Sequence, residues 1–475
     1  MKAFFAILRL TFRNALRSHI FQMLLGLLLL CVVVIPATVN DDGTAFSFIQ
    51  VSLLYSLSAV LLLLALASIW LGCYMMSHDI DGYQLHLIVA KPVSRVTIWL
   101  GKYCGILLLD ALLLCFSAAV IYGIILYKFN RSEFSEEERA RIVNEVLVGR
   151  RVFMPLLPDY DRMAHDALTR KYREQQMKGE SIDTSPEGQQ RAYQELRHQI
   201  VSQQSELPFQ QSVQWRYAGL PTDLDTPLYL RYRAYVGKID SNGQRQTSGV
   251  WSVLMPRIVE AEKANVNEST DKTKFESFWV PMSQAPESFM CGSFTEKALL
   301  PEWKLVAPDG TLTMGFINFD PQQEQLYFQQ EDGPKLLLRK TGFQGNYLRC
   351  VGVIFLELMI LTGLACAAAG VMTMPTSIFV VLSYLLLGSI ATFLLDAPGE
   401  ALSDHFGRLV SSLLLLVVIP IQEFEVTHLV ADGELIEFAL IWKLVWSYLL
   451  LRALPLFLIG IWLFRKRELG LVIRK

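Results

Sequence analysis

Long apolar runs dominate this sequence and limit what it can fold into. Six stretches of mostly hydrophobic residues occur, at 20–39, 48–75, 103–127, 347–372, 375–396 and 436–464. A helix of about 20 apolar residues crosses the hydrocarbon core of a bilayer, where only helices and closed barrels satisfy their own backbone groups. The composition agrees, since 52% of the residues are hydrophobic and 19% are charged. The sequence therefore predicts an α-helical polytopic membrane protein with six transmembrane helices.

The first residues, 1–19, carry a basic stripe ahead of the first span. Lys2, Arg9, Arg13 and Arg17 are spaced so that they fall on one side of a helix, and apolar side chains take the other sides. This pattern is typical of an amphipathic helix that lies in the membrane interface. We expect these residues to be retained as an interfacial helix and not to be cleaved as a signal peptide.

The positions of the charged residues predict the orientation of the spans. Basic residues lie at the N-terminus, in the loop 76–102 and in the tail 465–475, whereas the segment 397–435 is mainly acidic. The basic side is cytoplasmic under the positive-inside rule, which places both termini in the cytoplasm. Segment 397–435 also contains a short apolar run with Pro420, which predicts a re-entrant or interfacial piece on the outer side.

The polar middle, 128–346, separates the membrane regions 20–127 and 347–464 and is expected to be an extracytoplasmic α+β domain. Residues 132–205 have a helical pattern, in which Ser135 precedes three glutamates as a helix N-cap would. Residues 206–343 contain short alternating stretches separated by turn pairs such as Asp309-Gly310. Several short strands with such turns predict a β-sandwich.

The loop between the second and third spans is more mixed in composition than a simple connection requires. Residues 78–102 read HDIDGYQLHLIVAKPVSRVTIWLGK. Pro92 suits the first turn of a helix, where its missing N–H costs nothing. We expect a short helix, a break and a second helix that enters the third span, on a face where another protein can grip them. The alternative is a solvated basic linker that only anchors the spans.

This loop resembles that of the permease subunits of ABC-2 type exporters. That family typically has an acidic pair, Gly-Thr, an apolar stretch, Pro-x-Ser-Arg and Gly-Lys, which together form a coupling helix seated in a cleft of the ATPase subunit. The resemblance implies that the ATPase-coupling residues are Asp79, Asp81, Gly82, Lys91, Pro92, Ser94, Arg95, Gly101 and Lys102. Tyr83 stands where threonine is usual, and the acidic pair is one position out of the common register. The resemblance covers the membrane regions and leaves the polar insert without a motif.

Arg95 is the residue expected to contact the ATPase most directly, because a guanidinium can make several fixed hydrogen bonds to a partner. The resemblance implies a separate cytoplasmic P-loop ATPase that binds ATP and Mg²⁺, since this chain has no GxxxxGK[ST] motif. It also implies a second permease subunit, either identical or a sister chain, in the inner (cytoplasmic) membrane of a bacterium. Membrane lipid and an extracytoplasmic protein are further expected partners, and nothing predicts nucleic-acid binding.

The sequence contains no catalytic motif and no cluster of cysteine and histidine residues with metal-ligand spacing. We therefore expect no intrinsic enzyme activity, no cofactor bound by this chain and no metal site. The small-residue run GLACAAAG (363–370) favours close helix packing, either within one subunit or between two.

Three charged residues interrupt the apolar spans: Asp110, Glu357 and Arg452. Charges at membrane depth are costly, so they usually have a partner or a function. At about 1.5 Å of rise per residue, Glu357 and Arg452 fall at a similar depth and Asp110 lies nearer to the cytoplasmic side. We expect an ion pair between Glu357 and Arg452 that locks the fourth and sixth spans together. A contact with substrate is the alternative.

Taken together, these features predict a permease subunit that couples ATP hydrolysis in a partner to export or to mechanical work on the outer domain. The alternative is a membrane-anchored extracytoplasmic scaffold or sensor without transport. A secondary transporter would need repeated, broken helices around a midplane site, and the sequence has no such internal repeat.

Overall fold

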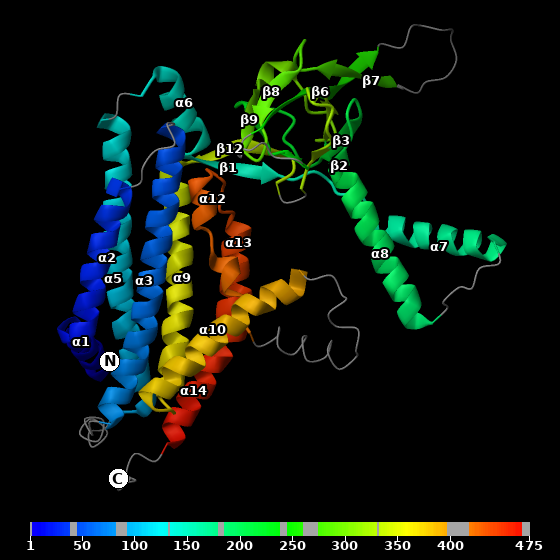
Figure 1. Cartoon of the computed structure of the whole chain (residues 1–475). Coiled ribbons are helices and arrows are strands. Elements are labelled where there is room, and N and C mark those ends of the chain that lie inside the picture. Colours follow the sequence, from blue (N-terminus) through cyan, green and yellow to red (C-terminus); the bar gives the residue numbers. More distant parts are fainter. Residues whose placement is uncertain are drawn as a thin grey trace, which may run out of the picture. The chain divides into compact units, whose positions relative to one another are not determined.

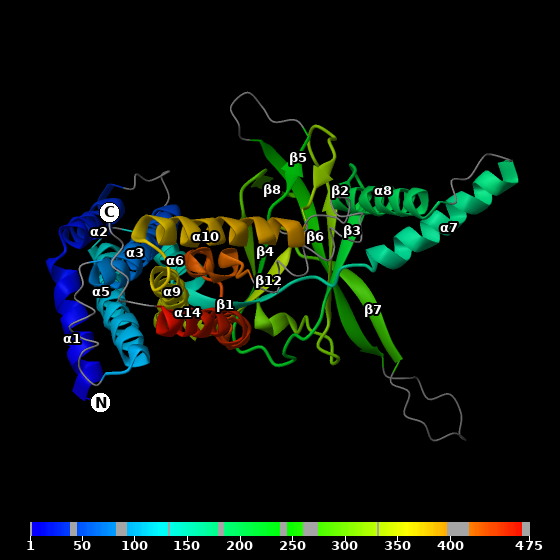
Figure 2. The same ribbon diagram turned by 90° about the horizontal axis from the view of Figure 1, so that it is seen from below.

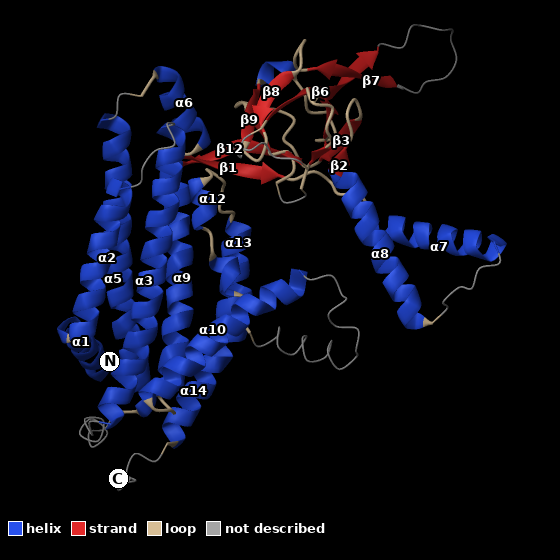
Figure 3. Cartoon of the chain, in the orientation of Figure 1, coloured by secondary structure: helices blue, strands red, loops and turns tan. Residues whose placement is uncertain are grey.

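The computed structural model describes residues 2–38, 45–81, 93–131, 134–178, 185–237, 245–259, 274–329, 332–396 and 418–467. The chain divides into two compact units, a helical unit (Met1–Gly149 and Thr341–Lys475) and a β-rich unit (Arg150–Lys340). Figure 3 shows the strands gathered in the β-rich unit, which also includes helices. The β-rich unit is narrower than the predicted outer domain, 128–346, because the residues at both ends of that range pack with the helices.

The helical unit is built mainly from long helices that pack along one another (Figure 1). Its elements are α1 (Lys2–Arg17), α2 (His19–Thr38), α3 (Ala45–Asp81), α5 (Arg95–Arg131), α6 (Glu136–Glu145), α9 (Phe343–Ala369), α10 (Met374–Asp396), a 3₁₀ turn (Ile421–Phe424), α12 (Thr427–Ala431), α13 (Phe438–Lys443), a π-helical stretch (Leu444–Ala453) and α14 (Leu454–Lys466). The predicted N-cap Ser135 forms a capping box with Glu138 at the start of α6.

Several of these helices are long and apolar enough to cross a membrane, as a multi-pass membrane protein requires. Within the described residues four qualify outright: Ile49–Ile80, Arg95–Arg131, Phe343–Ala369 and Phe438–Lys466. The first two helices, bent by 71° between Arg17 and His19, give a fifth candidate if they count as one span. The apolar helix Met374–Ile390 falls short of the length required. Four of the six predicted spans are therefore long and apolar enough as single, unbroken helices.

The last candidate span is continuous in the chain but irregular in its winding. Between α13 and α14, residues Leu444–Ala453 form a π-helix, a form that is rare beyond a single turn. Pro455 follows at the start of α14. A proline inside a helix lacks the N–H that the preceding turn needs, and its ring clashes with the carbonyl four residues back. The wider turns of the π-helix before Pro455 let the helix continue through the proline.

Small side chains set the close packing at the centre of the helical unit. A Cβ atom added to Gly363 would collide with the ring of Phe457 in α14, and one on Gly460 would collide with Ala367. A Cβ on Gly72 in α3 would lie 2.6 Å from the Cβ of Ala365. The small-residue run 363–370 is therefore used within this chain, where it brings α9 against both α3 and α14.

This packing predicts opposite effects for two alanine substitutions in the same helix. Gly363→Ala places a methyl group against the Phe457 ring, and overpacking of this kind typically costs about 1–3 kcal/mol. Gly352→Ala adds a methyl group where no atom lies within 4 Å, so the better helix propensity of alanine, worth about 1 kcal/mol, should dominate. Thermal unfolding in detergent should show a lower midpoint for Gly363→Ala only. Equal midpoints for the two variants would contradict this packing.

The described part of the acidic segment packs inward instead of lying free on the surface. Phe424, Val426 and Val430 are buried against the long helices, and Thr427 hydrogen-bonds the Ser58 hydroxyl of α3 at 3.2 Å. A re-entrant or interfacial piece was predicted for the segment 397–435, and residues 397–417 of it lie outside the described residues.

Within the described residues, the β-rich unit contains three sheets and two α-helices. Its elements are β1 (Val148–Phe153), α7 (Tyr160–Lys178), α8 (Pro186–Ser205), β2 (Glu206–Leu207), β3 (Ser212–Tyr217), β4 (Leu228–Tyr232), β5 (Tyr235–Val236), β6 (Gln246–Val259), β7 (Lys274–Pro281), β8 (Glu287–Met290), β9 (Thr295–Leu299), a 3₁₀ turn (Pro301–Trp303), β10 (Leu312–Asn318), β11 (Leu326–Tyr327) and β12 (Lys335–Gly342). The sheet orders are β1-β12-β4-β9, β3-β10-β6-β7 with β8 paired to β6, and β2-β11-β5.

One aromatic core joins the larger sheets. Tyr232 of β4 lies against Trp251 of β6 at 4.9 Å between ring centroids, and Trp251 lies against Phe316 of β10 at 4.9 Å. All three side chains are almost completely buried. The turn predicted at Asp309-Gly310 is present, with Gly310 at a positive φ of 72°. The four-stranded and five-stranded sheets thus face each other across these rings.

The predicted helical part, 132–205, is less uniform than expected. Strand β1 lies within it, and α6 belongs to the helical unit. Helices α7 and α8 form a hairpin that extends from one side of the β-rich unit (Figure 2). Asp161 on α7 fastens the hairpin by accepting hydrogen bonds from Tyr193 and Arg197 on α8, each at 2.8 Å.

Candidate functional site

Four helix ends from three separate regions of the sequence meet at one end of the helical unit. Helix α3 ends and α5 begins there, and α9 and α14 both end there (Figure 1). The segment between α3 and α5 is the one whose composition suggested a partner-binding loop. We call the charged side chains that join these ends, Asp79, Arg95, Lys102 and Arg467, the helix-end cluster.

The first member of the helix-end cluster is a buried ion pair between α3 and α5. The Lys102 ammonium lies 2.7 Å from the Asp79 carboxylate, and the two side chains are 4% and 13% exposed. The same ammonium donates a hydrogen bond of 2.5 Å to the carbonyl of Met75, one turn earlier in α3. A buried ammonium needs this neutralisation, because an unpaired charge in a low-dielectric interior is strongly unfavourable.

The second member, Arg95, joins the start of α5 to the end of α14. Ser94 accepts a hydrogen bond from the Thr97 amide at 3.1 Å, as a helix N-cap does, and Arg95 is the first helical residue after it. The Arg95 guanidinium donates to the carbonyls of Arg465 and Arg467, each at 2.7 Å. Helix C-termini expose unpaired carbonyls and partial negative charge, so a guanidinium is a favourable partner for them.

The third connection joins α14 to α9. Arg467 donates a hydrogen bond of 3.1 Å to the carbonyl of Gly370, the residue that caps the C-terminus of α9. Two further bonds hold α5 to α9. The Trp99 indole donates to the Cys366 carbonyl at 3.3 Å, and the Tyr103 hydroxyl donates to the Met359 carbonyl at 3.1 Å. The helix ends are therefore linked in a continuous set of contacts.

Helix α1 packs against the same turns of α5. A Cβ on Gly101 would lie 2.9 Å from a methyl carbon of Ile7, and one on Gly105 would lie 3.0 Å from the Cβ of Thr11. The two glycines are one turn apart, so they form a flat face that receives α1. The basic residues of α1 remain exposed, which leaves the predicted stripe available to an interface.

The structure brings together five of the nine predicted coupling residues, and their expected role in ATPase coupling stays a prediction. Asp79, Gly101 and Lys102 make contacts within the chain. The guanidinium of Arg95, which is expected to contact the ATPase, donates to carbonyls at the end of α14. Ser94 is exposed. Asp81 ends α3, and its side chain lies outside the described residues, as do Gly82, Lys91 and Pro92.

Sequence reasoning missed Arg467, Trp99 and Gly105 as members of this region. The spacing of Gly101 and Gly105 was a readable signal, because two glycines one turn apart permit close helix approach. Arg467 and Trp99 gave no such signal, since their partners are carbonyls about a hundred residues or more away in the chain.

The predicted Glu357–Arg452 ion pair is wrong for the described residues. Arg452 lies in the π-helical stretch, donates to the Val418 carbonyl at 2.8 Å and sits over the Tyr448 ring. Glu357 is 7% exposed, and one of its carboxylate oxygens has no described partner. A similar predicted depth does not determine which way either side chain turns.

Asp110 is the third charged residue in the spans, and it is fully buried between helices. Its carboxyl oxygen Oδ2 lies 2.9 Å from the Ser68 hydroxyl of α3 and 3.2 Å from the Thr362 hydroxyl of α9. It therefore joins the three central helices of the unit, above the helix-end cluster along α5.

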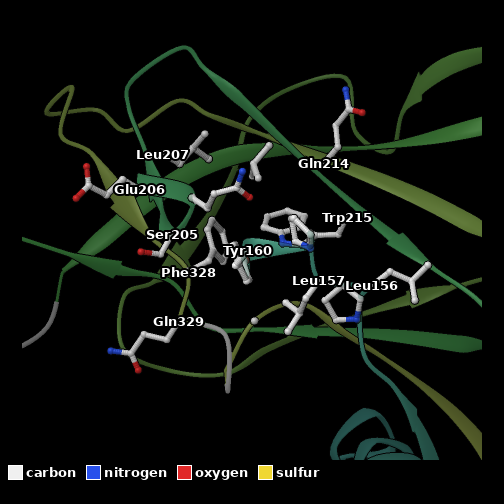
Figure 4. A pocket seen from close by; sticks show the side chains of 15 residues that line it. Leu156, Leu157, Tyr160, Ser205, Glu206, Leu207, Gln214, Trp215, Phe328 and Gln329 are labelled. Carbon is white, nitrogen blue, oxygen red and sulfur yellow. The ribbon is translucent and has the colours of Figure 1, made fainter. Parts of the chain in front are cut away.

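The β-rich unit contains a separate small cavity of about 90 Å³. Figure 4 shows Tyr160, Trp215 and Phe328 gathered at its centre, with Leu157 beside them and Gln329 turned away. Polar side chains, among them Ser205 and Gln214, complete the lining. Among the described residues, no group of three or more histidine, cysteine, aspartate or glutamate side chains is placed to hold a metal ion.

No protein-family model, curated protein or solved structure matches this chain. The helix-end cluster is therefore interpreted from its own contacts.

The buried ion pair predicts that two changes together are milder than one. Lys102→Met leaves the Asp79 carboxylate buried without its cation, and breaking a buried pair in this way typically costs about 3–5 kcal/mol. Asp79→Leu combined with Lys102→Met removes both charges and should recover much of that loss. Chemical or thermal unfolding of the single and double variants measures the difference. A double variant that is as unstable as Lys102→Met would show that the pair does not carry this energy.

Proposed function

We propose that this chain is the membrane permease subunit of an ATP-binding-cassette transporter, driven by a separate cytoplasmic ATPase that engages the segment between α3 and α5. The observation that carries the proposal is the helix-end cluster. Asp79 with Lys102 holds the two ends of that segment together, and Arg95 attaches its far end to α14. Displacement of the segment would therefore act on the helices together and not on a loose linker.

A rigid connection at the helix-end cluster is needed to transmit force from the ATPase to the helices. Charge-assisted hydrogen bonds are about twice as strong as neutral ones, and Arg95 contributes two of them to carbonyls at the end of α14. From there Arg467 reaches the end of α9. A linker that only anchored the spans by its positive charge would need none of these bonds.

The proposed topology has six spans with both termini in the cytoplasm, where α2 and α10 complete the set. Two features support this arrangement. Helix α1, whose basic residues are exposed, packs through Ile7 and Thr11 against Gly101 and Gly105 of α5. Helix α14 ends in Arg465 and Lys466 at the same end of the unit. Positive charge gathered at one end marks the cytoplasmic side of a membrane protein. The β-rich unit is then extracytoplasmic, in the inner membrane of a bacterium.

The transport cycle would end in export or in mechanical work on the β-rich unit. Strand β12 ends at Gly342 and α9 begins at the next residue, Phe343, without a loop. Movement of α9 would thus act directly on a strand that pairs with β4. The cofactor would be ATP with Mg²⁺ in the ATPase, and a second permease subunit would complete the translocation path.

Photo-crosslinking from Ser94 tests the proposed ATPase contact. Ser94 is exposed and adjoins the segment, so a benzophenone amino acid at this position should capture a nucleotide-binding partner in native membranes. Mass spectrometry of the product identifies the protein. The same substitution at Arg131, which is exposed at the other end of α5, is the matched control and should not capture it.

Two results would overturn the proposal. Capture of an extracytoplasmic protein from Ser94 would reverse the topology. The absence of any P-loop ATPase, from Ser94 or in crosslinked preparations of the native complex, would favour a scaffold or sensor whose work lies in the β-rich unit.

Arg95→Gln separates coupling from assembly. The change removes the guanidinium that caps α14, and hydrogen bonds of charged groups contribute about 1.5–3 kcal/mol. We expect amide hydrogen exchange to rise about tenfold or more near residues 463–467 because the helix end opens more often. The ATPase should still bind, but its hydrolysis should no longer drive transport. Arg131→Gln, a matched change at the other end of α5, should alter neither measurement.

A further inference from the structure

Asp110 occupies an unusual place for a carboxyl group. Its side chain is fully buried in α5, a helix long and apolar enough to cross a membrane. At 1.5 Å per residue it lies about 22 Å from the start of this helix and about 31 Å from its end. A charged group at such a depth is rare, and it is by default a candidate for function.

The hydrogen-bond geometry around Asp110 cannot be satisfied by an ionised carboxylate alone. The Ser68 hydroxyl lies 2.9 Å from Asp110 Oδ2 and 2.7 Å from the carbonyl oxygen of Leu64. Both of those neighbours are acceptors if Asp110 is ionised, and a serine hydroxyl has only one proton to donate. If Asp110 is protonated, it donates to Ser68 Oγ and Ser68 donates to Leu64. Each of the two close contacts of the Ser68 hydroxyl then has its own proton.

No described cation is available to neutralise Asp110. Lys102, two turns earlier in α5, is held by Asp79 and the Met75 carbonyl. Arg452 is bound to the Val418 carbonyl. The second carboxyl oxygen, Oδ1, is buried without a described partner. An ionised carboxylate in this setting would be very costly, whereas a neutral carboxylic acid is tolerated.

The other titratable groups near Asp110 do not favour its ionised form. On α5 they are Tyr103 and Cys104, on α3 Cys73, and on α9 Cys366. The Tyr103 hydroxyl is already directed to the Met359 carbonyl. All of these groups are neutral or acidic. The surroundings on each packed helix therefore favour a carboxyl group without charge.

We propose that Asp110 is a proton-binding site at the centre of the helical unit, where Ser68 and Thr362 hold its carboxylic acid between α3, α5 and α9. Separation of these helices would admit water, and the acid would then release its proton to that water as a carboxylate forms. Their closure would take up one proton again. The site is independent of the ATPase contact, so either proposal can fail alone.

Infrared difference spectroscopy of the full-length protein in lipid nanodiscs at pH 7.5 tests the site. A protonated carboxyl has a carbonyl band above the amide band, whereas a carboxylate absorbs well below it. The wild-type minus Asp110→Asn spectrum should contain the protonated band and should shift slightly in heavy water. Asp166→Asn is the matched control, because Asp166 is exposed on α7. Its difference spectrum should contain carboxylate bands only.

Ser68→Ala provides a second measurement that does not depend on the folding of Asp110→Asn. This variant retains the Asp110 carboxylic acid but removes the hydroxyl that accepts its hydrogen bond. The band of the protonated carboxyl should therefore persist at a shifted frequency. Carboxylate bands in the Asp110→Asn difference spectrum at pH 7.5 would overturn the proposal. So would bands that respond to Na⁺ at constant pH, because Asp110 would then be a cation site.

Discussion

The buried ammonium of Lys102 is the constraint on which the organisation of the helical unit depends. An ammonium group that is 4% exposed at the end of a membrane-length helix requires a carboxylate, and Asp79 supplies it from α3. This pairing fixes how the two helices meet beside the segment that connects them. It also aligns the first turns of α5 so that Arg95 reaches the end of α14 and Trp99 reaches α9. The ion pair that neutralises Lys102 thus also holds α5 in the position that its other contacts need.

Close packing in the rest of the unit depends on the absence of side chains at a few positions. Hydrophobicity does not hold helices together inside lipid, so contact area and polar bonds must do so. Gly72, Gly363 and Gly460 let α3, α9 and α14 approach one another. Asp110 then joins α3, α5 and α9 by hydrogen bonds at the same centre. A polar site and tight packing coincide there, so any movement of these helices must disturb the carboxyl group.

The β-rich unit is stabilised in a different way, by an aromatic core between sheets. Tyr232, Trp251 and Phe316 fill the space between the two larger sheets. Buried ion pairs, such as that between Arg245 and Asp320 at 2.7 Å, also stabilise this unit. Because β12 continues directly into α9, this unit is attached to one of the helices joined at the helix-end cluster. That continuity gives the proposed work on the β-rich unit a physical route.

The sequence by itself determined the membrane class, the positions of most apolar helices and the polar insert with its strands. These follow from local properties: the length of apolar runs, alternation along strands, and turn or capping residues such as Ser135 and Gly310. Only the tertiary structure decided which groups face each other. Arg95 donates to carbonyls about 370 residues away, and Arg452, within the π-helical stretch, donates to Val418 and does not pair with Glu357. Composition sets whether a residue is buried, but the direction of a side chain depends on the rotation of its helix, which packing against distant segments determines.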